Sequence, residues 1–440
     1  MKYSRFTFFD SIFKYTIIAM VVGMTSCNSK TNGNNTPTSP QGENFVLEKD
    51  RDQKLLIEIN DNEPIPAAYL LGEWIEKLKG KRIALVGNQT SVVKTGDTVV
   101  SKEWDIRDKV RYAHLVDTLL AHGIEIKRVF APEHGFRGTA DAGASIKDGV
   151  DEQTGIPIIS LYGKNKKPFK EQLEDVDIVL FDIQDVGTRF YTYISTLHYV
   201  MEACAEFDRK LILLDRPNPN GHYIDGPILE KKYQSFVGMH PVPVVHGMTI
   251  GEYAMMINGE KWLDKKLQAD LEIIKCKKYT HATPYSVPIK PSPNLPNDQA
   301  INLYPSLCFF EGTEVSVGRG TEMQFQVYGS PSLAKYTDFA FTPTPNEGAK
   351  RPVFNGKKCF GVDLRTYKKL DHLELAFLVD AFAKAPSKQN FFNPFFTKLA
   401  GTTILQTQIE KGMSAQEIAL TWEKGLEDYQ KIRLNYLLYE

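Results

Sequence analysis

The sequence predicts an α/β protein: a Rossmann-like parallel sheet with flanking helices, followed by a smaller C-terminal α/β domain. From Lys81 onward, short apolar runs alternate with amphipathic stretches, which is typical of parallel strands joined by crossover helices. Polar, glycine-rich or proline-rich residues follow each run. Beyond about residue 240 the connections become rich in proline, which indicates a second domain.

Four apolar runs are expected to form neighbouring strands. They are residues 82–86, 126–130, 177–181 and 211–214. A helix containing Leu115 and Leu119 is expected between the first two. Ligands bind outside the carboxyl ends of the strands in open parallel sheets, so we expect the active cleft there.

The second domain is expected to contain a long loop from Tyr304 to Tyr328 and to end in a helix. Ser414 and Glu417 have the spacing of a capping box, which marks the start of that helix. The apolar residues of one helical face follow at Ile418, Trp422, Leu426 and Tyr429. We expect these side chains in the core.

The first segment resembles a bacterial export signal. Basic residues precede the apolar stretch 15–24, and Thr25 and Ser26 lead to Cys27, as in a lipoprotein cleavage site. A plain secretory signal or an uncleaved anchor is the alternative. We expect a signal peptide at 1–26, lipidation of Cys27 and a flexible tether at 27–50, because residues 28–43 lack apolar side chains.

These features divide the chain further into a Rossmann-like catalytic domain at 51–240 and an auxiliary domain at 241–440. They predict an exported, membrane-anchored lipoprotein. Residues 28–43 contain no acidic run of the kind that would signal surface display, which favours a periplasm-facing position.

Composition excludes several functions. The 53 Lys and Arg residues are balanced by 54 Asp and Glu residues, so no net charge attracts the chain to nucleic acid. The turn at 87–91 lacks the G-x-G-x-x-G spacing of dinucleotide sites, and neither a P-loop nor a G-x-S-x-G elbow occurs. Metal motifs such as H-E-x-x-H and paired C-x-x-C are also absent, so we expect neither a metal nor a cofactor.

Glu133 and His134 follow the second predicted strand and precede Gly135. A partly buried glutamate at this position can serve as a general acid, and His134 can orient it or hold substrate. The alternatives are that Glu133 caps the next helix and that His134 is structural. Arg137 lies close by in the sequence.

A dense group of charged residues follows the third strand. It comprises Asp182, Asp185 and Arg189, with Gln184 between the carboxylates and Tyr191 after the arginine. Carboxylates bind sugar hydroxyls, guanidinium groups bind carboxylates and aromatic rings stack on pyranoses, so this set favours an acidic carbohydrate. An internal Asp–Arg pair that stiffens the loop is the alternative.

Further candidates for substrate binding occupy turns and the second domain. They are Asn88, Asp215, Arg216, Asn218, His246, Asn294, Glu311 and Arg319. The first four lie in turns after predicted strands, where Asp and Asn also serve turn geometry. Arg319 lies between two glycines and is a candidate second clamp for an anionic ligand.

Six sequence blocks in this order resemble the exo-β-N-acetylmuramidases of the NamZ type, once described as a domain of unknown function. The blocks are APEHGFRG (131–138), FDIQDVGTRFYTYI (181–194), LDRPNPNG (214–221), HGMTIGE (246–252), PSPNLP (291–296) and EGTEVSVGRGT (311–321). The resemblance extends from about residue 65 to the C-terminus, where Trp422 and Arg433 also match.

The resemblance implies a Rossmann-like domain and a smaller C-terminal domain with the active cleft between them. It implies removal of terminal N-acetylmuramic acid from the non-reducing end of peptidoglycan fragments, with Glu133 as the catalytic residue. The lactyl carboxylate of that sugar would explain candidate arginines in a chain of net charge −1: Arg137, Arg189, Arg216 and Arg319.

Glycoside cleavage commonly uses a second carboxylate as nucleophile or base. Asp182, Asp185 and Glu311 compete for this role, and attack by the substrate's own acetamido oxygen is a third route. Two other functions remain open: a non-enzymatic, lipid-anchored muropeptide-binding protein, and a metal-dependent hydrolase using Glu133, His134 and Asp182. The expected partners are muropeptides or disaccharides and the membrane. The sequence decides neither the oligomeric state nor the pairing of Cys204, Cys276, Cys308 and Cys359.

Overall fold

The computed structural model describes residues 63–95, 111–137 and 148–440, which belong to one compact unit spanning Glu58–Glu440. The predicted signal peptide, Cys27 and the predicted tether lie outside the described residues. Within the described ranges, every helix is too short or too polar to cross a membrane.

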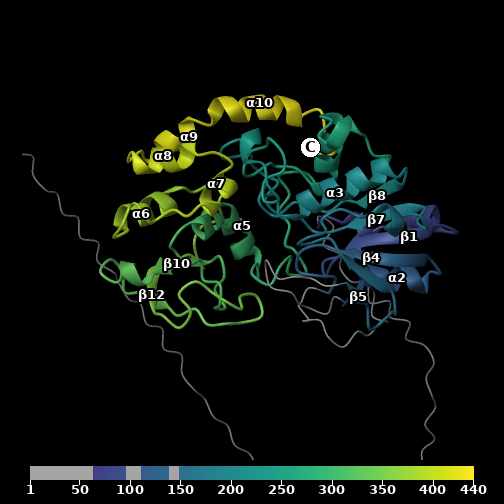
Figure 1. Cartoon of the computed structure of the whole chain (residues 1–440), viewed down its shortest axis with the longest axis horizontal. Helices are drawn as coiled ribbons and strands as arrows, with labels where there is room; N and C mark the ends of the chain where they lie inside the picture. Colours follow the sequence, from purple (N-terminus) through teal and green to yellow (C-terminus); the bar gives the residue numbers. More distant parts are fainter. Residues whose placement is uncertain (1–62, 96–110, 138–147) are drawn as a thin grey trace, which may run out of the picture. The chain divides into compact units, whose positions relative to one another are not determined.

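A seven-stranded sheet forms the centre of the N-terminal half (Figure 1). Its strands lie in the order β5-β6-β4-β1-β7-β8-β9, and all neighbours are parallel except β5 and β6. The bounds are β1 Arg82–Gly87, β4 Glu125–Ala131, β5 Gly149–Val150, β6 Pro157–Ser160, β7 Ile178–Asp182, β8 Lys210–Leu214 and β9 Leu271–Ile274. The predicted fold class and the four predicted strands are confirmed.

Alternating residues of these strands enter two different cores. Ala84 and Val86 of β1 pack on the side of α3 (Tyr193–Glu206) and α4 (Ile250–Gly259). Ile83 and Leu85 pack on the side of α2 (Leu115–Ala121), together with the short helix α1 (Leu71–Trp74). Burial on both faces explains why the strands are continuous apolar runs.

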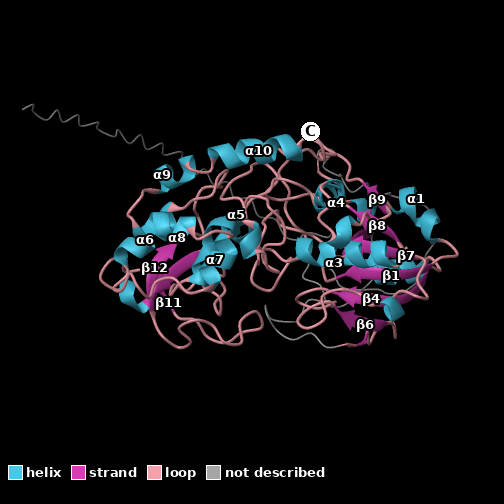
Figure 2. Ribbon diagram, turned by 45° about the horizontal axis from the view of Figure 1, so that its top comes forward, coloured by secondary structure: helices cyan, strands magenta, loops and turns pink. Residues whose placement is uncertain are grey.

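The C-terminal half contains a small sheet surrounded by helices (Figure 2). Its antiparallel strands are β10 Val327–Ser330, β11 Ala340–Phe341 and β12 Cys359–Asp363. The helices are α5 Asp298–Leu307, α6 Ala376–Lys384, α7 Phe395–Ala400, α8 Ile404–Glu410, α9 Ala415–Leu420 and α10 Glu423–Arg433. A separate hairpin pairs β2 Val92–Thr95 with β3 Arg111–His114.

Two predicted elements differ from the structure. The predicted loop from Tyr304 to Tyr328 begins instead as the end of α5 and a 3-10 helix at Cys308–Gly312. Asn297 caps the start of α5 by accepting a hydrogen bond from the backbone amide of Ala300. The predicted final helix is divided into α9 and α10. The Ser414 capping box is present, but the Thr421 hydroxyl and amide both bond to the Ile418 carbonyl, which tightens the chain and ends α9.

The sheet continues beyond residue 240, because β9 pairs with β8. The described residues form a single compact unit and do not test a division at residue 240. The predicted division therefore stays a prediction. The cysteines whose pairing the sequence left open, Cys204, Cys276, Cys308 and Cys359, are free and buried.

Candidate active site

A cavity of about 960 Å³ lies at the carboxyl ends of the sheet strands and extends to the C-terminal half. Its N-terminal lining comes from the segments after β4, β6 and β7, which contribute Glu133, Tyr162 and Tyr191. Its C-terminal lining includes Asn294, Glu311 and residues 349–353. The position agrees with the general rule that parallel sheets bind ligands at the carboxyl ends of their strands.

Glu133 is held at the wall of this cavity by groups from two other segments. Its side chain is 9% exposed, and the Thr192 hydroxyl donates a 2.7 Å hydrogen bond to its Oε2. Thr192 immediately precedes α3, so the carboxylate lies at the N-terminal end of that helix. Burial and the neighbouring Glu133 raise the pKa of Tyr162.

Both hydroxyl neighbours suit a group that changes protonation state. A hydroxyl donates to an ionised carboxylate and can accept from a protonated one. Thr192 and Tyr162 can therefore contact Glu133 before and after proton transfer. These contacts are compatible with a general acid or base at Glu133.

The turn that carries Glu133 is strained. His134 has a φ of 72°, which side chains other than glycine rarely adopt, and Gly135 has a φ of 79°. The Gly135 amide donates to the Pro132 carbonyl at 3.1 Å and closes the turn. The described residues that follow, 134–137, form turns and bends and not a helix, so Glu133 does not cap a helix within them. His134 lines the cavity beside it.

The segment 291–296 contributes a wall of the cavity next to the turn that follows β1. Gln89 donates to the carbonyls of Lys290 and Pro291 at 3.1 and 3.0 Å. Asn88 donates to the Tyr193 hydroxyl at 2.8 Å, and that hydroxyl donates to Pro291 at 2.9 Å. Asn88 thus supports the wall from behind and does not itself line the cavity.

The C-terminal side of the cavity presents an ion pair. Arg319 lies 2.7 Å from Glu311, and each side chain is 24% exposed. Arg319 also donates to the Gly348 carbonyl at 3.3 Å. The positive φ values of Gly318 and Gly320, 77° and 83°, explain the two glycines that flank it.

Comparison with known proteins assigns the chain to a family. The family models described as exo-β-N-acetylmuramidase NamZ, N-terminal, and exo-β-N-acetylmuramidase NamZ, C-terminal, match residues 83–299 and 302–439. The chain belongs to the NamZ family.

Known proteins are similar to this chain over most of its length. The peptidoglycan β-N-acetylmuramidase NamZ of Bacillus subtilis (strain 168) is 39% identical over 392 residues, which are 84% of this chain and 90% of that protein. A crystal structure of a DUF1343 family protein from Bacteroides fragilis is 44% identical with a TM-score of 0.76, and covers 86% of this chain and 99% of the other. A second such protein from B. fragilis is 27% identical with a TM-score of 0.70, and covers 86% and 100%.

The cavity brings together part of the predicted site. The predicted residues that line it are Glu133, His134, Tyr191, Asn294, Glu311 and Arg319. The others lie behind the lining or elsewhere in the fold.

Asp182 and Arg216 form an internal ion pair. Arg216 donates to both carboxylate oxygens at 2.6 and 2.8 Å, and the two side chains are 0% and 1% exposed. Arg216 also donates to the Val92 carbonyl at 3.1 Å. The predicted roles of Asp182 in catalysis and of Arg216 as an anion clamp do not agree with this environment, because each charge is already satisfied by the other.

Arg189 is also used internally. Its terminal nitrogens donate to the carbonyls of Pro227, Val242, Leu399 and Ala400 at 2.7 to 2.9 Å. It therefore joins two loops of the N-terminal half to α7 rather than facing a ligand. Arg137 is paired with Asp151 at 2.7 Å and likewise does not line the cavity.

Asp185 and His246 lie together behind the lining, with His246 Nε2 3.7 Å from Asp185 Oδ2. Burial raises the pKa of Asp185 to about 7 and lowers the pKa of His246 to about 3. Gln184 donates to the carbonyls of Asp185 and Pro217, both at 2.8 Å. These side chains hold the strand-end loops, and no direct contact with the cavity supports the catalytic role predicted for Asp185.

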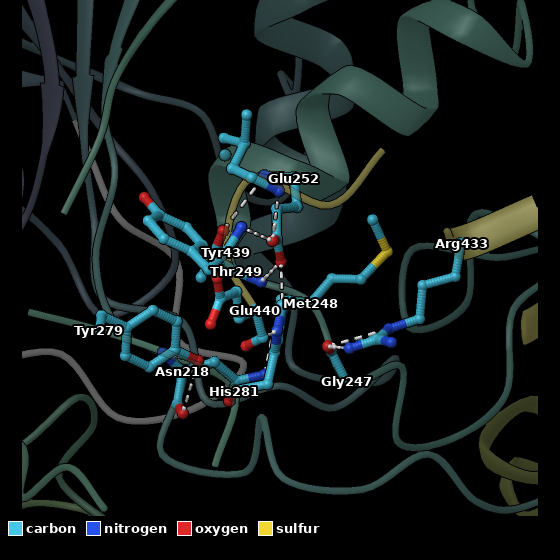
Figure 3. A network of polar contacts seen from close by, with 12 residues as sticks. Asn218, Gly247, Met248, Thr249, Glu252, Tyr279, His281, Arg433, Tyr439 and Glu440 are labelled. Carbon is cyan, nitrogen blue, oxygen red and sulfur yellow. Dashed lines mark hydrogen bonds and ion pairs between the residues drawn. The ribbon is translucent and has the colours of Figure 1, made fainter. Parts of the chain in front are cut away.

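Asp215 and Asn218 belong to a polar network around the start of α4. Figure 3 shows Asn218 in this network. Asp215 Oδ2 accepts hydrogen bonds from the hydroxyls of Thr249 and Tyr439, both at 2.7 Å. Asn218 donates to the Met248 carbonyl at 2.9 Å. The HGMTIGE and LDRPNPNG blocks therefore contact each other and the C-terminal tail, which explains them as structural motifs.

Sequence reasoning did not identify several lining residues. They are Tyr162, Lys166, Thr192, Phe236, Lys350 and Arg351. Thr192 lay within a recognised block, so its position next to α3 was a usable signal. Lys350 and Arg351 lie in a segment without a motif, and they reach the cavity through the tertiary fold.

Proposed function

We propose that this chain removes terminal N-acetylmuramic acid from the non-reducing end of peptidoglycan fragments, with Glu133 as the general acid. Membership in the exo-β-N-acetylmuramidase family supports a glycoside hydrolase that acts on peptidoglycan. The observation that carries the role of Glu133 is its position: a mostly buried carboxylate, hydrogen-bonded to Thr192, at the wall of the cavity.

The surrounding residues suit the reaction. Tyr162, Tyr191 and Phe236 provide aromatic surface for sugar rings. Arg319 is paired with Glu311 but, unlike Arg216, is partly exposed in the cavity, so it can also provide a cation for the lactyl carboxylate. Glu133 would protonate the glycosidic oxygen as the bond to the anomeric carbon breaks. The leaving sugar departs with that proton. Water then adds to the anomeric carbon as hydroxide, and its remaining proton passes to a carboxylate of the site, which returns Glu133 to its protonated form.

Glu311 is the proposed second carboxylate. Among the described residues that line the cavity, the carboxylates are Glu133 and Glu311. Attack by the acetamido oxygen of the substrate is the alternative. A loss of activity of about a hundredfold or more in Glu311→Gln would support a direct role. Near-full activity with retention of the anomeric configuration, measured by NMR of the released sugar, would favour the acetamido route.

The central test uses protein that starts at Glu58 and a chromogenic β-glycoside of N-acetylmuramic acid. Glu133→Gln should lower kcat by roughly a hundred- to ten-thousandfold. Glu125→Gln, at the exposed start of the same strand, is the matched control and should keep full activity. Full activity of Glu133→Gln would overturn its assignment.

The same assay separates the competing functions. Tight binding of muropeptides by the unmodified protein without release of sugar would identify a binding protein. Loss of activity on treatment with a chelator would identify a metal-dependent hydrolase. Among the described residues, no group of three or more His, Cys, Asp or Glu side chains is placed to hold a metal ion.

We also propose that the chain is an exported lipoprotein, attached to the membrane through Cys27 and facing the periplasm. The basic start, the apolar stretch and the small residues before Cys27 support this proposal. In the full chain, Cys27→Ser should move the protein from the membrane fraction to the soluble fraction, whereas Cys359→Ser should not. Cleavage by protease added to intact cells would contradict the periplasmic position.

A further inference from the structure

The segment 349–353 lines the cavity, and its exposed side chains indicate a position at the opening, so we refer to it as the rim segment. Ala349 and Pro352 are buried, whereas Lys350, Arg351 and Val353 are exposed. Two cationic side chains and an apolar one therefore border the entrance.

The rim segment is attached to the active-site wall. The Gly348 carbonyl, just before it, accepts hydrogen bonds from Asn294 at 2.7 Å and from Arg319 at 3.3 Å. Backbone bonds between Asn346 and Ala349, at 3.1 and 3.3 Å, close the turn. The side chains of Lys350 and Arg351 thus start from a backbone whose position is fixed relative to the cavity.

Charge is unevenly distributed in the cavity. Among the described lining residues, the cations are Lys166, Arg319, Lys350 and Arg351, and the carboxylates are Glu133 and Glu311. Glu311 is paired with Arg319. The mouth therefore carries positive charge, although the formal net charge of the chain is −1. This positive charge is a local feature and does not follow from the overall composition.

The proposed substrate carries carboxylates at intervals. The peptidoglycan backbone alternates N-acetylglucosamine with N-acetylmuramic acid, so every second sugar carries a lactyl group. The cavity, at about 960 Å³, is near the upper end of the roughly 300–1,000 Å³ found for pockets that hold drug-sized ligands. It has room for more than the sugar that is released.

We propose that Lys350 and Arg351 form an outer anion-binding subsite for a second carboxylate, carried on the leaving part of the substrate. This inference rests on the proposed muramidase function and adds a preference for longer, anionic fragments. The carboxylate is the free lactyl group of the next N-acetylmuramic acid, or a carboxylate of the stem peptide where that lactyl group is amidated.

The experiment compares two kinds of substrate with protein that starts at Glu58. One is the chromogenic glycoside with an uncharged leaving group, and the other is the trisaccharide N-acetylmuramic acid–N-acetylglucosamine–N-acetylmuramic acid. The quantity measured is the ratio of kcat/KM for the trisaccharide to that for the glycoside. In Lys350→Gln/Arg351→Gln this ratio should fall by roughly two- to thirtyfold, the range expected for two exposed ion pairs.

The control is Lys357→Gln/Lys358→Gln, which makes the same change of charge at exposed residues of the same region outside the cavity lining. Its ratio should equal that of the unmodified protein. A second trisaccharide, with a stem peptide on its last sugar, tells the two carboxylate sources apart. If the subsite binds the free lactyl group, the ratio falls for the plain trisaccharide only. If it binds a carboxylate of the stem peptide, the ratio falls for the peptide-bearing trisaccharide only.

An unchanged ratio for both trisaccharides in Lys350→Gln/Arg351→Gln would overturn the inference. A lower ratio in the control variant to the same extent would also overturn it, because nonspecific attraction would then explain the preference. Failure of the unmodified protein to cleave the chromogenic glycoside would instead refute the proposed function. The two failures are therefore distinguishable.

Discussion

At the scale of single residues, the hydrogen bond from Thr192 to Glu133 makes a specific prediction. Thr192→Val keeps the shape of the side chain and removes the hydroxyl. Because hydrogen bonds to charged groups contribute about 1.5–3 kcal/mol, kcat should fall by roughly ten- to a hundredfold. Thr192→Ser should restore most of the activity and the original pH profile of kcat. Equal activity of Thr192→Val and the unmodified protein would show that this bond does not support catalysis.

His114 makes a prediction about pH and stability. It is 3% exposed, contacts the Asn88 carbonyl through Nε2 at 2.9 Å, and accepts from the Val116 amide through Nδ1 at 3.3 Å. Burial, followed by the nearby Arg137, lowers the pKa of His114 to about 3. In the unfolded chain the pKa of this histidine is about 6.5. At pH values between the folded and unfolded pKa, the unfolded chain binds a proton that the folded chain does not.

Acid should therefore reduce the free energy of unfolding. The contribution of His114 is complete above about pH 6.5 and is lost as the pH falls, by up to about 1.4 kcal/mol per pH unit. The free energy of unfolding, measured with denaturant, should fall less between pH 7 and pH 5 in His114→Gln than in the unmodified protein. His122→Gln, at the exposed end of the same helix, is the control. Identical losses in all three proteins would contradict the assignment.

At the scale of elements, the start of α4 connects the N-terminal half to the last residues of the chain. Glu252 is fully buried and accepts hydrogen bonds from Thr249, His281 and the backbone amides of Leu438 and Tyr439 (Figure 3). The Thr249 amide and His281 Nε2 lie 2.8 and 2.9 Å from its Oε2. This one carboxylate completes a capping box and also holds the tail.

Glu252→Gln should therefore destabilise the fold strongly, because the amide nitrogen of Gln would face donors in a buried site. We expect a loss of about 2–4 kcal/mol in the free energy of unfolding, measured with denaturant. The matched control is Glu417→Gln in the exposed capping box of α9, where the loss should be no more than about 1 kcal/mol. Similar losses in the two variants would mean that the contacts with the tail contribute little.

Local patterns predicted the elements where local contacts determine them. Apolar runs identified the strands, and the Ser414–Glu417 spacing identified the start of α9. The break between α9 and α10 was missed because a turn-tightening bond from Thr421 does not interrupt the apolar periodicity.

In the candidate site, too, the features that depend on local sequence were predicted and those that depend on tertiary contacts were not. Glu133 was predicted because the end of a strand is a local feature. The pairing of Asp182 with Arg216, 34 residues apart, and the contacts of Arg189 with carbonyls 210 and 211 residues away depend on tertiary structure. A polar residue at a strand end can face the cavity or support the loop behind it, and its sequence context is similar in both cases.

At the scale of the whole molecule, buried contacts join the two halves. Arg189 connects the N-terminal loops to Leu399 and Ala400, and Arg433 of α10 donates to Gly247, as Figure 3 shows. In Figure 1, α10 extends from the C-terminal helices toward the sheet. The contact of Arg189 with Leu399 adjoins the cavity, because Leu399 lines it, and together these contacts hold the two sides of the cavity in place.

Protein that starts at Glu58 should therefore unfold in a single cooperative transition, although chains of this length often unfold domain by domain. Calorimetry should give equal calorimetric and van't Hoff enthalpies. Arg189→Lys should lower the free energy of unfolding by about 2–4 kcal/mol, because one ammonium group cannot satisfy four carbonyls that converge from two directions. Lys398→Arg, on the same helix as the last two carbonyls, should have little effect. Two separate transitions in the unmodified protein would contradict this prediction. If they correspond to the parts before and after residue 300, where the two family models meet, the halves fold independently and these contacts only position them.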